Sequence, residues 1–285
     1  MLTNAYIDAT QIHPEKGVAQ PGRIGILSVQ GLGSPSPRNE TFDLPRRHGA
    51  TNRTQFYAPR VLDIQGRIWA DSDADVITTL DLLKQRLALD GADQVFKFRR
   101  SAMTVDEYLN VRVASPLEWD LIPGRHQYLL WAVQLVAADP RMYSNTLQTS
   151  TTIQALAPGG MPLPIVFPIV FSGSGGSASI ITNAGNFPTP PTIRVYGPVE
   201  NPKVVNQTTN KQVATTAILG SSDWIEIQVA ARRLLLNNVL RNDLIAPATT
   251  QWWDLAAGSN TVRLVGSAIV SGTTSLVVEW RDARI

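Results

Sequence analysis

The last third of the sequence alternates apolar and polar residues between turns, and this pattern limits what the chain can fold into. Val262 and Leu264 fall on one side of segment 261–265, while Thr261 and Arg263 fall on the other. Residues rich in glycine, serine and asparagine interrupt the alternation at both ends. A period of two between turn residues is typical of an antiparallel strand with one face in water. We therefore expect antiparallel β-structure here.

Similar short segments recur from residue 150 to the C-terminus, without a helical period. Regularly spaced short strands separated by turn signals indicate a β-sandwich or barrel. The expected strands are 165–171, 178–181, 192–196, 203–207, 213–219, 224–228, 232–237, 261–265 and 276–280.

The first half of the chain has a mixed α+β pattern. Its expected strands are 24–29, 60–69, 94–99, 107–115 and 126–137. The last of these is apolar on both sides, so we expect both of its faces to be covered. Overall the sequence predicts a mainly β protein, with an α+β first half and an all-β second half.

One helix is expected at 73–89. Ser72 and Asp75 stand at capping-box spacing, with Asp in place of the usual Glu. Gly91 is the expected stop, because glycine adopts the left-handed C′ conformation without steric cost. The stripe that should pack on the sheet consists of Val76, Leu80, Leu83 and Leu87.

The polar stretch 144–160 marks the expected domain junction. Pro140 closes the strand before it, because proline cannot continue a central ladder. We therefore expect two domains, at 1–145 and 150–285.

The segment 31–59 is rich in Gly, Pro, Ser, Asn and Arg, without apolar periodicity. Loops of this length inside a compact domain are uncommon and are usually functional or disordered. We expect it to act as an arm that crosses to a neighbouring subunit, with Arg46, Arg47, His48 and Arg53 as contact residues.

Several phrases, in order along nearly the whole chain, resemble distal tail proteins of long-tailed, non-contractile bacteriophages. A strand ends in Ala-Asp-Pro at 138–140, and an Asn-x-Gly turn precedes a proline at 183–188. A strand ending in Tyr-Gly at 196–197 is followed by Asn-Pro at 201–202, and the chain closes on Trp-Arg-Asp-Ala-Arg at 280–284.

The resemblance implies an N-terminal belt domain, a C-terminal galectin-like sandwich, and a homo-hexameric ring, single or double, at the tail tip of the virion. The implied partners are the tail-tube protein, a tail hub protein and receptor-binding or baseplate proteins. DNA would pass through the channel without specific binding, and the ring would assemble in the host cytoplasm.

Composition argues against several other functions. The 25 Lys and Arg residues are scattered and the formal net charge is +2, which does not suggest a nucleic-acid-binding face. The chain has no cysteine, which excludes thiol nucleophiles and thiolate metal sites. We expect no catalytic residues, no metal and no cofactor.

Two features imitate metal sites without meeting their requirements. Residues 71–75 resemble the start of a calcium loop, but Val76 and Leu82 stand where that loop needs Gly and Glu. The histidines lie far apart in sequence. We also find no signal-peptide pattern and no apolar run of about 20 residues, so no membrane insertion is expected.

Two alternatives remain open. A tail-tube subunit shares the expected first-half architecture, and a carbohydrate-binding or glycan-processing sandwich could stack sugars on Trp252 or Trp253. These two neighbours face opposite sides of a strand, so at most one belongs to the core and the other is a candidate exposed contact.

Overall fold

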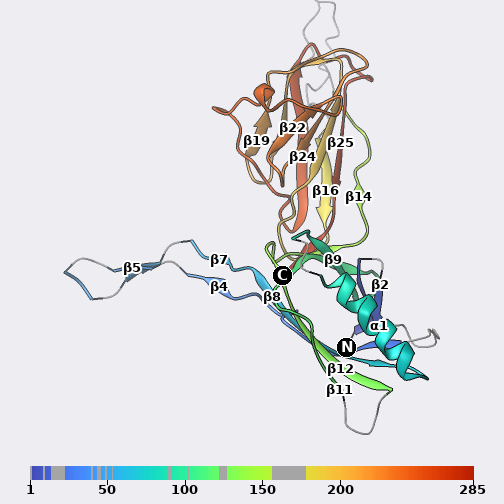
Figure 1. Cartoon of the computed structure of the whole chain (residues 1–285). Helices are drawn as coiled ribbons and strands as arrows, with labels where there is room; N and C mark the ends of the chain where they lie inside the picture. Colours follow the sequence, from blue (N-terminus) through green and yellow to red (C-terminus); the bar gives the residue numbers. More distant parts are fainter. Residues whose placement is uncertain are drawn as a thin grey trace, which may run out of the picture. The chain divides into compact units, whose positions relative to one another are not determined.

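The computed structural model describes residues 2–8, 10–13, 23–39, 41–43, 46–48, 50–52, 54–88, 91–101, 103–121, 127–155 and 178–285. The chain divides into two compact units, Met1–Thr146 and Leu147–Arg284. Strands make up most of the regular structure in both units (Figure 1). The predicted mainly β fold class is confirmed.

The first unit is built on an antiparallel sheet with the strand order β2-β1-β9-β10-β12-β8-β3; β11 also pairs with β12, and β13 with β10. The strands are β1 (Leu2–Ile7), β2 (Thr10–His13), β3 (Arg23–Gln30), β8 (Arg60–Trp69), β9 (Gln94–Arg100), β10 (Glu107–Val113), β11 (Glu118–Leu121), β12 (Tyr128–Ala137) and β13 (Met142–Ser144). The five strands predicted from sequence are present, while β1, β2, β11 and β13 were not predicted.

Strands β8 and β12 form the longest ladder, from Tyr128 opposite Trp69 to Ala137 opposite Arg60. One face of β12 is buried in the core through Leu129, Trp131, Val133, Leu135 and Ala137. The other face is only half-buried. The prediction that both faces are covered is therefore wrong for a single copy of the chain, since the core lies on one side of this strand.

Helix α1 (Asp73–Arg86) begins as the capping-box spacing predicted. The Ser72 hydroxyl oxygen accepts a hydrogen bond from the Asp75 backbone N–H at 3.2 Å. The four stripe residues are all buried, so the helical spacing identified the packed face correctly. Two acidic residues in its first turn and two basic residues in its last turn also complement the helix dipole.

The helix stops earlier than predicted. Leu87 is its C-cap, and the Leu87 N–H donates to the carbonyl oxygen of Leu83 at 2.9 Å. Gly91 does adopt a left-handed conformation, with φ of +74°, but it lies beyond the C′ position. The backbone N–H of Leu87 thus closes the last turn of the helix, while the Leu87 side chain packs in the core with the rest of the apolar stripe.

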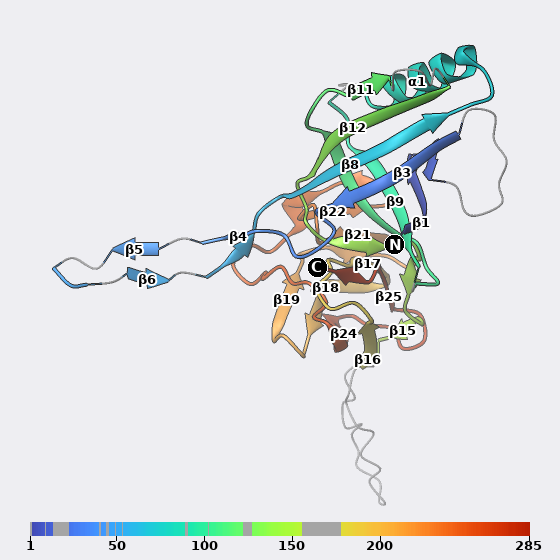
Figure 2. The ribbon, with the colours of Figure 1, turned by 90° about the horizontal axis from the view of Figure 1, so that it is seen from below.

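The segment 31–59, in which no strand was predicted, contains paired strands. Strands β4 (Pro37–Arg38) and β7 (Phe56–Tyr57) pair, and β5 (Thr41–Asp43) pairs with β6 (Ala50–Asn52). The segment is thus a long hairpin, which we call the arm. It extends outward from β3 and β8 in both views (Figures 1 and 2).

The second unit is a sandwich of two antiparallel sheets around one apolar core. One sheet has the order β14-β25-β17-β21-β22-β23, with β15 also on β25; the other has the order β16-β24-β18-β19, with β20 also on β18. The strands are β14 (Gln148–Thr149), β15 (Ile153–Gln154), β16 (Ala178–Asn183), β17 (Thr192–Tyr196), β18 (Val199–Asn206), β19 (Lys211–Ala214), β20 (Ile218–Leu219), β21 (Trp224–Gln228), β22 (Arg233–Leu236), β23 (Val239–Leu240), β24 (Gly258–Ser267), β25 (Ser275–Trp280) and β26 (Ala283–Arg284).

Most strand predictions in this unit are confirmed, and those at 192–196 and 224–228 match β17 and β21 at both ends. The predicted strand 213–219 is divided between β19 and β20. The predicted strand 165–171 lies outside the described residues. The short 3₁₀ helix η1 (Asn242–Leu244) is the helical element in the described part of this unit.

The α1 stripe provides a stability test with a neighbouring control. Leu83 is fully buried, whereas Leu82 is 45% exposed on the same turn. Leu83→Ala should lower the free energy of unfolding by about 2–5 kcal/mol, because it leaves a cavity in the core. Leu82→Ala should cost less than about 1 kcal/mol. Urea unfolding of the two variants measures both changes; equal losses would contradict the assigned core face.

Candidate functional site

Most described residues of the arm are exposed to water in a single copy of the chain. All described residues of β4 and β7 are exposed, and the arm carries large hydrophobic side chains at its surface, namely Phe42, Phe56 and Tyr57. Arg38 lies over the Phe56 ring at 5.8 Å. A two-stranded ribbon alone is marginally stable in water. These properties favour a segment that is completed by contact with another surface.

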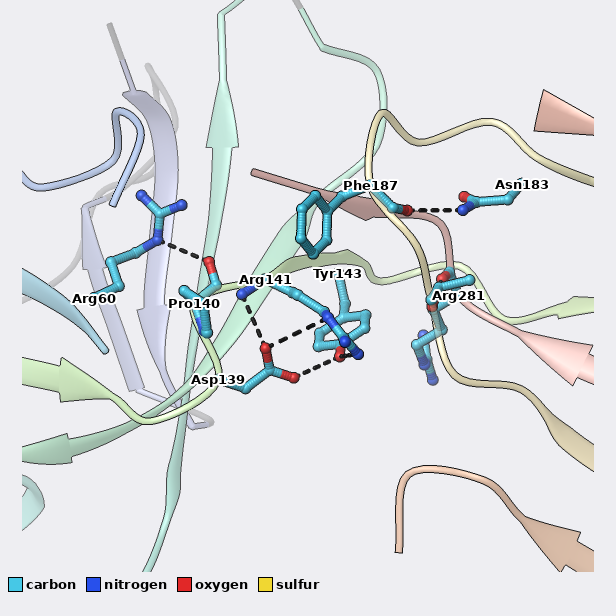
Figure 3. Close-up of polar contacts among 9 residues, drawn as sticks. Arg60, Asp139, Pro140, Arg141, Tyr143, Asn183, Phe187 and Arg281 are labelled. Atoms are coloured by element: carbon cyan, nitrogen blue, oxygen red, sulfur yellow. Dashed lines mark hydrogen bonds and ion pairs between the residues drawn. The ribbon is translucent and has the colours of Figure 1, made fainter. Parts of the chain in front are cut away.

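Arg60, the first residue of β8, fixes the base of the arm from within the sheet. Its buried guanidinium donates through Nη1 to the carbonyl oxygens of Gly31, at 2.7 Å, and of Gly33. Its Nε donates to the carbonyl oxygen of Pro140 at 3.0 Å (Figure 3). Three carbonyl dipoles thus surround a buried cation, which compensates part of the cost of its desolvation.

Burial, and then the nearby positive charge of Arg100, lower the pKa of Arg60 from its ordinary value. Arginine titrates so high that the side chain nevertheless stays charged at neutral pH. One feature of the sequence points to this anchor. Arg60 occupies the same alternate positions of β8 as the buried Leu62 and Ile64, so its side chain is expected on the buried face.

Gly31 forms the turn at the base of the arm. Its φ of +92° is in the left-handed region, and a Cβ at this position would overlap the carbonyl oxygen of Val61. Glycine is therefore required where the chain leaves β3 and enters the arm. The direction of the arm is set by this turn and by the Arg60 hydrogen bonds.

The predicted contact residues lie near the far end of the arm. Arg46, Arg47 and His48 are exposed, and within the described part of the chain they form no ion pair. Arg53 lies outside the described residues. The structure therefore places three cationic or titratable side chains together on a surface that the first unit leaves uncovered.

A second polar cluster follows β12, at the Ala-Asp-Pro phrase. Tyr143 donates to Asp139 Oδ2 at 2.6 Å, and the Arg141 backbone N–H donates to Asp139 Oδ1 at 3.1 Å (Figure 3). Burial, and then the Asp139 charge and hydrogen bond, raise the pKa of Tyr143. The carboxylate thus organises the turn that carries Pro140, the acceptor of Arg60.

In the second unit, Arg194 on β17 bridges carboxylates on both neighbouring strands. Its Nε lies 2.9 Å from Glu226 Oε2, and its Nη1 lies 3.0 Å from Glu279 Oε1. The hydrogen bond to Glu226 is the main cause of the raised pKa of Arg194. Burial alone would raise the pKa of Glu226, but hydrogen bonds from Gln228 and Arg194 and the Arg194 charge lower it overall. The cluster ties three strands together.

The adjacent tryptophans of the sandwich are not an open aromatic platform. Trp253 is 2% exposed and belongs to the core, so it is not the exposed contact considered from sequence. Trp252 is half-buried and packs against the same core. Asn183 supports the turn of the Asn-x-Gly phrase by donating to the carbonyl oxygen of Phe187 at 2.8 Å (Figure 3).

Across the described residues, no group of three or more His, Asp or Glu side chains is arranged to hold a metal ion. The acids at 71–75 include the first turn of α1, where Asp75 takes part in the cap. None of the described helices combines the length and apolar character that a membrane span requires.

Residues 184–282 match the family model of the siphovirus-type tail component, C-terminal domain. The matched residues all lie within the second unit. The predicted resemblance to the distal tail proteins is confirmed, and so is the prediction of a structural tail component. No curated protein sequence matches the chain.

Solved structures extend the similarity of fold to the whole chain. The Dit protein (gp 19.1) of phage SPP1, described as a paradigm of the hub adsorption apparatus in phages infecting Gram-positive hosts, matches with a TM-score of 0.68 and 13% identity, over 99% of each chain. A chain of the phage P2 baseplate activated with Ca matches with a TM-score of 0.50 and 10% identity, over 91% of this chain and 90% of that one. The P2 baseplate with Sr gives 0.50 and 10%, over 97% of both chains.

The anchor of the arm can be tested by removing its charge. Arg60→Met should lower the free energy of unfolding by about 2–5 kcal/mol, because buried carbonyl oxygens lose their donors. Amide hydrogen exchange at residues 31–34 should accelerate as well. Arg38→Met, on the exposed arm, should change stability by less than about 0.5 kcal/mol. Unchanged exchange in Arg60→Met would argue against the anchor.

The lowered pKa of Glu226 predicts an acid-dependent loss of stability. A carboxylate with a folded-state pKa below its unfolded value stabilises the fold above the unfolded pKa, near about 4.3, and loses this contribution as the pH falls through the folded pKa. Denaturant unfolding from pH 7 to pH 3 should therefore show a shallower acid decline for Glu226→Gln than for the parent. Glu118→Gln, at an exposed site outside the cluster, should follow the parent curve.

Proposed function

We propose that this chain is a ring-forming hub of a phage tail tip, with six copies in each ring. The belt-like first unit closes the ring around the channel, and the sandwich serves as a platform for receptor-binding or other baseplate proteins. The tail-tube protein and a tail hub protein would bind the two ends of the ring. One ring or two back-to-back rings would meet these requirements.

The observation that carries this proposal is the whole-chain similarity to the Dit protein of phage SPP1, combined with the tail-component family match of the second unit. A tail-tube role would need only the first unit, whereas the similarity includes both. The role proposed is structural, without catalysis, metal or cofactor.

The near-neutral balance of charge suits a ring through which DNA passes without specific binding. With a formal net charge of +2, the chain lacks the strong positive field that retains nucleic acid. The proposed protein would act in the virion, after assembly in the host cytoplasm. Filter binding with double-stranded DNA at physiological salt should show no retention above that of a neutral control protein.

The oligomeric state is the direct test. Light scattering of the purified chain should give six or twelve times the chain mass, and negative-stain images should show rings with a central hole. Long tubes would favour the tail-tube alternative. A protein that remains monomeric at high concentration and on a tail-tube template would contradict ring formation.

The arm should be essential for this assembly. Deletion of residues 35–55 removes β4, β5 and β6, and so the partner of β7, but keeps Gly31, Gly33 and Arg60. Rings should be lost, while far-UV circular dichroism and the unfolding transition of the sandwich remain like those of the parent, since the second unit has its own core. Normal rings from the deleted chain would refute this role of the arm.

A further inference from the structure

One face of the sandwich combines aromatic rings with a fixed row of hydrogen-bonding groups. Strands β25, β17, β21 and β22 are neighbours in that order in one sheet (Figure 2). Alternate residues of these strands, such as Val195 and Ile225, are fully buried in the core. The residues between them therefore lie on the outer side of the sheet. The surface that we call the outer patch consists of Arg194, Tyr196, Trp224, Glu226, Gln228 and Glu279.

The aromatic part of the outer patch is a pair of rings. Tyr196 and Trp224 stand opposite each other in the ladder between β17 and β21. Their ring centroids are 6.5 Å apart, with 35° between the ring planes. Tyr196 is 37% exposed and Trp224 is half-buried, whereas Trp253 is enclosed in the core. The pair therefore offers to water the apolar aromatic surface that the adjacent tryptophans do not.

Hydrogen bonds hold the strand ends that carry both rings. The Trp224 backbone N–H donates to Asn237 Oδ1 at 3.0 Å, and Asn237 Nδ2 donates to Asp223 Oδ1 at 2.9 Å. The N–H of Gly197, directly after Tyr196, donates to the Asp223 carbonyl oxygen at 2.9 Å. The backbone under the rings is thus fixed before any ligand arrives, which lowers the entropy that binding would lose.

The polar row of the outer patch lies beside the rings. Arg194 holds both glutamates, and Gln228 Nε2 donates to Glu226 Oε1. The side chains of Arg194, Glu226 and Glu279 are 34%, 12% and 20% exposed, so each still faces water in part. A guanidinium has more N–H donors, and a carboxylate more acceptor sites, than these bonds use. The row is therefore fixed in position but keeps groups for a ligand.

This combination suits the chemistry of a pyranose sugar. A pyranose ring has an aliphatic C–H face, which packs on an aromatic ring, and each of its hydroxyls both donates and accepts hydrogen bonds. A carboxylate beside a guanidinium supplies an acceptor and a donor to neighbouring hydroxyls of one sugar. Sites for small ligands typically join apolar surface with a few convergent polar groups in this way.

Charge selects the kind of ligand. The outer patch and its edge contain the carboxylates of Asp223, Glu226 and Glu279, against the guanidiniums of Arg194 and Arg233. This negative balance disfavours nucleic acid and acidic sugars. A protein that covered the patch would desolvate the ion pairs, and that cost can exceed their attraction. A neutral sugar leaves the pairs in place and partly hydrated.

We propose that the outer patch binds a neutral hexopyranose unit of an oligosaccharide or polysaccharide. The sugar stacks on Trp224 beside Tyr196, and its hydroxyls form hydrogen bonds with Arg194 and Glu279. The inference does not depend on the ring, because all of these residues belong to the second unit of one chain. In the proposed ring, six such sites would bind a repeating polysaccharide more tightly than one site alone.

Saturation-transfer NMR on the full chain tests the site with soluble pentasaccharides of glucose, galactose and mannose. At least one of them should bind through its ring C–H protons. Trp224→Ala should weaken that binding by at least about tenfold, because the stacking surface is lost. Trp224→Phe keeps an aromatic face and should stay within about threefold of the parent. Trp119→Ala removes a 47% exposed tryptophan of the first unit and should bind like the parent.

Glu279→Ala provides a second variant in case Trp224→Ala fails to fold, which unfolding curves would show. It should weaken binding by at least about fivefold, since a sugar hydroxyl loses its acceptor. A parent chain that binds none of the three neutral pentasaccharides would overturn the proposal. So would binding that both variants leave unchanged, or a preference for pentagalacturonate over the neutral sugars.

The remaining outcomes distinguish this site from a protein-docking surface and from the ring. If the parent binds no sugar while Trp224→Ala weakens attachment of tail-tip proteins, the outer patch is a protein-docking surface and the proposal is overturned. If the chain stays monomeric but binds a neutral sugar through Trp224, the sugar site stands and the six-fold assembly fails.

Discussion

The ladder between β8 and β12 is the interaction on which the rest of the first unit depends. Its ten-residue strands bury every second side chain of β12 against α1 and the remaining sheet. The same register fixes where β8 begins, and therefore where the chain turns out into the arm. A slip of one residue would move the apolar side chains to water and bring polar ones into the core, so the register is strongly specified.

Arg60 lies at the end of that ladder, and its hydrogen bonds fix the place where the arm leaves the sheet. A buried cation is costly unless it is hydrogen-bonded. Here it is held by carbonyl groups that belong to both the arm base and the turn after β12. The guanidinium therefore couples two segments that are far apart in sequence. A leucine at this position would fill space but would leave the carbonyl oxygens of Gly31 and Pro140 without this donor.

Much of the fold was predictable because the signals are local. The period of α1, its Ser72 cap and the alternation in β17 and β21 depend on residues adjacent in sequence, and the structure follows them. Short edge strands such as β11 depend on a distant partner and have no periodicity of their own, so they were missed. The paired strands of the arm were missed for the same reason.

The site was harder to predict than the fold. Charge and exposure at the arm tip could be inferred from composition, and Arg46, Arg47 and His48 are indeed exposed. The hydrogen-bond partners of Arg60 and the ion-pair partners of Arg194 could not be found from sequence, since they lie in segments far along the chain. Trp253 was considered from sequence as an exposed aromatic contact, because its large ring could stack on a sugar or a partner. It is instead packed in the core of the sandwich.

A weak arm contact is compatible with a stable ring because closure makes the last contact intramolecular. In an open chain of copies each contact is opposed by the full loss of translational freedom, whereas the contact that closes the ring is made at a high effective concentration. If the exposed Arg46 and Arg47 contribute to the arm contact, ring stability should fall as the ionic strength rises, because salt weakens attraction between solvent-exposed charges.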